Sequence, residues 1–146
     1  MAASDKGFSA QERAAMKERA AELKASSRRG SAAEKAAADL ADLRAKVEEM
    51  SGTDRAIAEA LHSIVSEHAP QLAARTWYGM PAYARHGKAI VFFKAAGKFK
   101  TRYAEVGFNE QAQLDDGAMW PTAYAVTELT PEVQAALVEL VRRAAG

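Results

Sequence analysis

The sequence contains no cysteine among its 146 residues. Disulfide bonds, cysteine zinc sites and thiolate nucleophiles are therefore excluded. It also lacks the run of about 20 apolar residues that a membrane-spanning helix needs. The opening residues, Met1 to Gly7, show no apolar core of a secretory signal. These absences favour a cytoplasmic protein with no membrane partner.

The chain as a whole has almost no net charge. Its 20 basic and 19 acidic residues leave a formal net charge of +1. A balance of this kind gives no long-range attraction for nucleic acid, so we expect no nucleic-acid partner. The charges are nevertheless segregated, because residues 68–104 hold seven basic and no acidic side chains. This middle segment is the only part of the sequence with a strong sign.

Catalytic and metal-binding patterns are also scarce. The three histidines (His62, His68 and His86) are scattered, no serine lies in a nucleophile elbow, and no glycine-rich phosphate loop is present. We therefore predict no catalytic residue and favour a non-enzymatic role. Iron sites need clustered carboxylates or two histidines with a carboxylate, and the acidic pairs here form no such cluster. We predict no metal ligands and no cofactor. The acidic pairs considered are Asp39 and Asp42, Glu48 and Glu49, and Asp115 and Asp116.

Helices are predicted at both ends of the chain. Ser9 to Glu12 and Ser31 to Glu34 fit capping boxes, which indicates helices from about 9 to 25 and from about 31 to 50. Apolar residues at spacings of three and four predict a third helix over 53–68. Thr130-Pro131 begins a final helix. The first helix has few large apolar residues, so we divide the chain into a mobile or marginally helical arm (1–30) and a single domain (31–146).

Short aromatic and β-branched runs predict about four strands. The turns between the first three are expected at His86-Gly87 and Ala96-Gly97, and Pro81 is expected at an edge or a bulge. Asn109 is expected to cap a short helical piece. The order predicts an α+β fold: N-terminal helices, a small antiparallel sheet and a C-terminal helix packed on it. The predicted strands are Trp77–Arg85, Lys88–Ala95, Lys98–Gly107 and Ala123–Leu129.

The run Trp77-Tyr78-Gly79-Met80-Pro81, followed by Gly87-Lys88-Ala89-Ile90-Val91-Phe92-Phe93, resembles the signature of the YdhG-like family, domain of unknown function 1801. The likeness covers roughly residues 39–146. It implies a compact α+β fold grouped with frataxin-like and YjbR-like proteins, and some members carry an iron-chaperone label. It implies no catalytic residues.

The basic hairpin is the clearest candidate site. With a two-residue turn at Ala96-Gly97, Phe93 and Val91 would share a sheet face with three bases, giving an aromatic floor beside a positive wall. A solvated face whose lysines deter edge pairing is the structural alternative. Trp120 either lines a pocket or fills the core. The candidate ligand-binding residues are Tyr78, Met80, Phe93, Lys98, Lys100, Arg102 and Trp120.

Three functions follow from these patterns. The first is a non-catalytic binding module for a small or anionic ligand at the sheet face. The second is iron binding, as the family resemblance implies. The third is a helper domain that acts through protein contacts and uses the N-terminal arm.

Overall fold

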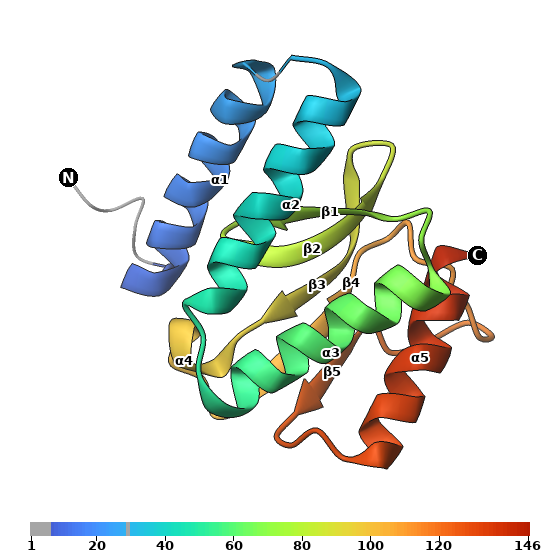
Figure 1. Cartoon of the computed structure of the whole chain (residues 1–146). Helices are drawn as coiled ribbons and strands as arrows, with labels where there is room; N and C mark the ends of the chain where they lie inside the picture. Colours follow the sequence, from blue (N-terminus) through green and yellow to red (C-terminus); the bar gives the residue numbers. More distant parts are fainter. Residues whose placement is uncertain (1–6, 29) are drawn as a thin grey trace.

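The computed structural model describes residues 7–28 and 30–146, and it has the α+β architecture expected from the sequence (Figure 1). Residues 1–6 and Arg29, all in the predicted N-terminal arm, lie outside the described residues. The helices are α1 (Ala10–Arg28), α2 (Ala32–Glu48), α3 (Gly52–His68), α4 (Ala96–Phe99) and α5 (Pro131–Ala145). The strands are β1 (Ala73–Trp77), β2 (Met80–Arg85), β3 (Lys88–Lys94), β4 (Ala104–Phe108) and β5 (Ala123–Val126).

The capping signals in the sequence mark the helix starts. Ser9 and Glu12 exchange side-chain to backbone hydrogen bonds in front of α1, and Ser31 and Glu34 do the same in front of α2. The Val133 amide donates to the Thr130 hydroxyl at the start of α5. Each bond satisfies an amide that the first turn leaves without a partner. The predicted helix starts are confirmed.

The sheet is a five-stranded antiparallel meander with the spatial order β1-β2-β3-β4-β5. The sequence predicts about four strands, because its first predicted strand starts at Trp77 and misses β1, which ends there. In the structure the chain reverses at Tyr78-Gly79, and Trp77 pairs with Met80 across this two-residue turn. The expected turn at His86-Gly87 is confirmed by the pairing of Arg85 with Lys88.

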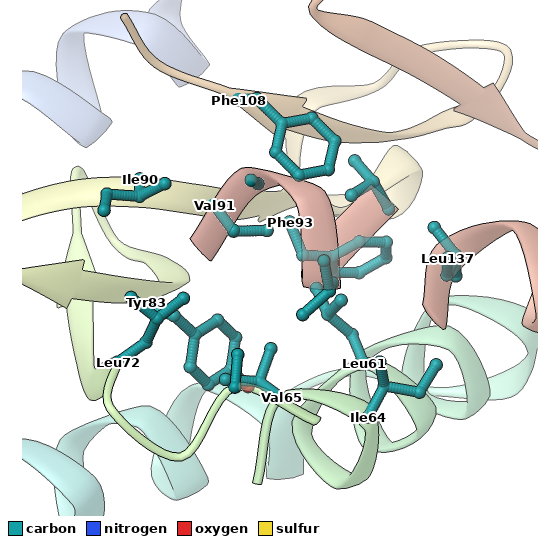
Figure 2. Packing of buried hydrophobic residues seen from close by; sticks show 14 of the residues in the cluster. Leu61, Ile64, Val65, Leu72, Tyr83, Ile90, Val91, Phe93, Phe108 and Leu137 are labelled. Atoms are coloured by element: carbon teal, nitrogen blue, oxygen red, sulfur yellow. The ribbon is translucent and has the colours of Figure 1, made fainter. Parts of the chain in front are cut away.

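The core lies between one face of the sheet and the helices. α3 and α5 contribute Leu61, Val65 and Leu137, which face Phe93 and Phe108 of the sheet (Figure 2). α2 adds Leu43 and Val47, both buried. Burial of this apolar surface is the main stabilising contribution to the fold.

The predicted strand Lys98–Gly107 is wrong over its first half. The Asp54 carboxylate accepts hydrogen bonds from the amides of Ala96 and Gly97, at 3.1 and 2.9 Å. These contacts start the short helix α4 where a hairpin turn was expected. The pairing of β3 with β4 therefore begins later, with Lys94 opposite Glu105.

Two smaller expectations also need correction. Pro81 lies in the second strand of the sheet, not at an edge, and precedes the first β2–β3 pair at Ala82. Asn109 caps no helix; its side-chain amide donates to the Ala89 carbonyl, and a turn follows. Within the ranges described, no helix is long and apolar enough to cross a membrane.

Candidate functional site

The turn between β1 and β2 has an unusual backbone. Tyr78 and Gly79 have φ angles of +53° and +74°, the left-handed conformation of a two-residue hairpin turn. This conformation is costly for Tyr78, because a side chain crowds the following carbonyl. It directs two successive backbone amides away from the hairpin, an arrangement that suits an anion.

Carboxylates of α1 bind at this turn. The amides of Tyr78 and Gly79 donate to the two oxygens of Glu22, at 3.1 and 2.9 Å. The Lys98 ammonium donates to Glu18, at 3.0 Å, and to the Gly79 carbonyl, at 2.9 Å. Lys46 of α2 lies 3.3 Å from the same Glu18 oxygen. We call the two amides with Lys46 and Lys98 the turn site.

The sheet face opposite the core is aromatic beside this turn. The strand register places Phe92 opposite Gly107, where the missing side chain leaves room for the ring. The rings of Trp77 and Phe92 lie 5.3 Å apart, and Trp77 contacts Tyr78 edge to face at 4.8 Å. Edge-to-face and tilted contacts at these distances are favourable.

A cleft opens between this face and α1. It encloses about 380 Å³, and we call it the outer cleft. Its walls are mainly apolar, with Lys94, Glu12 and Glu105 among the lining residues. The Lys94 ammonium lies 5.2 Å from the centre of the Phe99 ring. The apolar lining comes from Phe8, Ala15, Met16, Trp77, Tyr78, Met80, Phe92 and Phe99.

Of the candidate residues, the structure brings together Tyr78, Met80 and Lys98, which lie at or beside the turn. Phe93 was expected as an aromatic floor on the basic face, and this was wrong. Phe93 is fully buried on the core side (Figure 2), and its neighbour Phe92 lies on the outer face.

The remaining candidates lie elsewhere. Lys100 is exposed after α4, with a φ of +55°, and Arg102 is exposed over the ring of Tyr103. The proposed alternation of three bases on one strand is therefore absent, because α4 interrupts the strand. Trp120 is half-buried against the core and also lines a separate cavity of about 390 Å³ with Leu114 and Met119.

Two groups of residues at the site were not anticipated. Phe92 could have been found by shifting the strand register, because adjacent strand residues point to opposite faces, whereas Phe99 belongs to α4, which the sequence did not reveal. Glu18 and Glu22 are spaced by four, so they share one helix face. That spacing is common in surface helices, and nothing in the sequence singled it out.

A side-chain pair between α3 and β2 forms a second polar environment. His62 Nδ1 lies 3.0 Å from the Tyr83 hydroxyl, which belongs to a buried side chain. Burial, and secondly the positive charge of Arg44, lower the pKa of His62. Burial raises the pKa of Tyr83. Both shifts favour the neutral forms of the two side chains, between which the hydrogen bond is made.

The residues that the structure describes contain no recognisable set of metal ligands. No three histidine, aspartate or glutamate side chains are grouped so that they could hold a metal ion. Asp115 and Asp116 are exposed in a loop. The iron function that the family resemblance implies therefore stays a prediction without supporting geometry in these residues.

Comparisons with known proteins identify no relative. No family model matches the sequence, no curated protein matches it, and no solved structure matches the fold. The resemblance to the YdhG-like family therefore stays a prediction, and the function has to be argued from the site itself.

Proposed function

We propose that the protein is a non-catalytic binding module that holds a small, flat, mainly apolar ligand in the outer cleft. One observation carries the proposal: an apolar cleft of about 380 Å³ lies on the sheet face that the core does not use. Clefts of about 300–1,000 Å³ with apolar walls and a few polar groups are typical of small-molecule sites.

The lining supports an aromatic or similarly flat ligand. Trp77 and Phe92 contribute ring surface from adjacent parts of the sheet, and Phe99 does so from α4. Stacking on such rings adds about 0.5–1.5 kcal/mol beyond the burial of area. The polar part of the ligand would meet Lys94 together with Glu12 and Glu105, and this mixed lining favours a neutral or zwitterionic ligand over a strongly anionic one.

The first test is native mass spectrometry of the purified chain, which would reveal a retained ligand by its mass. A thermal-shift screen of small aromatic compounds follows, with each hit titrated against Trp77 fluorescence. Trp120→Phe removes the signal of the other tryptophan, which lies at a different cavity. We expect binding in the micromolar range and a change in Trp77 emission.

A matched pair of variants locates the site. Phe99→Ala removes a wall of the outer cleft and should weaken binding at least fivefold. Tyr103→Ala removes an exposed aromatic ring outside it and should leave binding unchanged. A screen with no hit, or hits that tolerate Phe99→Ala, would refute the proposed function.

A further inference from the structure

The arm α1 is attached to the domain mainly through polar contacts. Among its nineteen residues only Ala15 is buried, while Met16 and Leu23 are 39% and 55% exposed. Figure 1 shows α1 alongside α2 at one end of the sheet, and the Glu18–Lys46 ion pair joins the two helices there. A helix with so little apolar burial depends on its charged contacts for its position.

Those contacts form a matched pattern. Glu18 and Glu22 are one helical turn apart, and each meets its own set of donors. Glu22, with a side chain only 12% exposed, fits the two amides of the Tyr78-Gly79 turn. Glu18 lies between the ammonium groups of Lys46 and Lys98. The turn site therefore recognises two carboxylates at a fixed separation.

The four donors of the turn site all come from segments outside α1. Its two amides are aligned by the left-handed backbone of the hairpin, and Lys98 is held by its bond to the Gly79 carbonyl. A site of two amides and two ammonium groups attracts carboxylates whichever chain they come from.

α1 leaves unfilled space between itself and the rest of the domain in two places. The outer cleft remains open beside its first half, and a second space of about 330 Å³ remains between α1, α2 and β1, lined in part by Ala21 and Thr76. Small side chains on α1 leave this volume unfilled. The outer cleft has mainly apolar walls, whereas charged side chains, among them Asp42 and Glu49, line much of the second space. A helix with the same carboxylate spacing and larger side chains matched to these walls would fit the surface better.

We propose that the turn site is a docking surface for a helix of a partner protein that presents two glutamates one turn apart, and that α1 is the internal occupant that this helix displaces. The proposal does not require the small ligand, but displacement of α1 would remove the wall of the outer cleft that Ala15 and Met16 form. It explains why the two carboxylates of α1 match the four donors of the turn site although α1 buries almost nothing else.

Because α1 is covalently attached to the domain, it competes with any partner helix for the turn site. A short linker joins α1 to α2 around Gly30, and short flexible linkers give effective concentrations of about the millimolar range. A partner helix must therefore outcompete the arm, and weakening the arm should raise its apparent affinity.

The experiment uses the full chain and a fluorescein-labelled peptide of residues 7–28 as a stand-in for the partner helix, followed by fluorescence anisotropy. The peptide should bind the Glu18→Gln/Glu22→Gln chain at least tenfold more tightly than the wild-type chain, in which the arm competes. Adding Lys98→Gln to that chain should weaken binding at least fivefold. Lys88→Gln, at the exposed second hairpin turn, is the control and should have no effect.

A second peptide tests the spacing. Exchanging Glu18 with Ala20 in the peptide (Glu18→Ala/Ala20→Glu) preserves composition and net charge but places the two glutamates on different sides of the helix. We expect its binding to fall at least tenfold. Equal binding of both peptides, or binding that ignores Lys98, would show non-specific charge attraction and overturn the proposal.

A measurement on the wild-type chain covers the case in which the double variant folds poorly. Excess peptide should speed amide hydrogen exchange in residues 10–28 and leave exchange in the sheet unchanged. No change at saturating peptide would overturn the proposal. Light scattering gives the oligomeric state of the wild-type chain and completes the test. A dimer formed by exchange of α1 would mean that the occupant is a second copy of this chain, which would overturn our choice of a partner protein.

Discussion

Two hairpin glycines offer a direct measurement of how strongly α1 is held. Gly79 and Gly87 both occupy the second position of a two-residue turn, with φ of +74° and +78°. Substitution by alanine puts the same backbone strain on both, about 1–2 kcal/mol, reduced by about 0.4–1 kcal/mol through the unfolded chain. We therefore expect Gly87→Ala to destabilise the fold by about 1 kcal/mol.

The surroundings of the two glycines differ. A methyl group at Gly87 meets nothing within 4 Å, whereas one at Gly79 would overlap the Glu18 carboxylate and the Lys98 ammonium. Glu18 can move away, but it then loses its partners Lys98 and Lys46. Partly exposed ion pairs contribute up to about 1 kcal/mol each. Gly79→Ala should therefore cost about 1 kcal/mol more than Gly87→Ala.

Urea unfolding monitored by tryptophan fluorescence gives the free energies of unfolding. The comparison is repeated in a Glu18→Ala/Lys98→Ala background, where the excess cost of Gly79→Ala should disappear because both overlapping groups are already absent. Equal costs at the two glycines in the wild-type background, or an excess that persists without Glu18 and Lys98, would refute the contact between α1 and the turn.

Two further predictions concern the core side and the cleft. His62 has a lowered pKa, so the unfolded chain binds more protons than the folded one. The free energy of unfolding should therefore fall as pH drops below about 6.5. His62→Gln should flatten this part of the pH profile of stability, and an unchanged slope would contradict the prediction. Gly107→Ala should destabilise the fold by about 1–3 kcal/mol, because its methyl group would overlap the Phe92 ring. A smaller ring-free side chain in the double variant Gly107→Ala/Phe92→Leu should recover part of this loss in thermal unfolding, and an additive loss would count against the packing.

Local sequence signals were sufficient where the determining contact lies within a few residues. Ser31 and Glu34 cap α2 through bonds three residues apart, and the His86-Gly87 turn joins strands that follow one another. The α+β class followed from the order of these elements. No long-range information was needed for either feature.

The candidate site depended on contacts between distant residues, and there the predictions failed. Asp54 starts α4 from 42 positions away, so the sequence around Ala96-Gly97 still looked like a hairpin turn. That error gave β3 the wrong partner residues in the next strand. As a result, Phe93 was assigned to the outer face in place of Phe92. Tyr78 in a left-handed conformation was equally hidden, because an aromatic residue there is locally unfavourable.

The strand order has a consequence for how the chain folds. Each strand of the meander pairs with the one that follows it in the sequence, so every sheet contact closes a loop of modest length. The β1–β2 and β2–β3 turns contain only two residues each, and hairpins of that kind form within about 1–10 μs. The sheet can therefore grow hairpin by hairpin from the Tyr78–Gly87 region, and we expect the later docking of α3 and α5, rather than strand pairing, to limit the refolding rate.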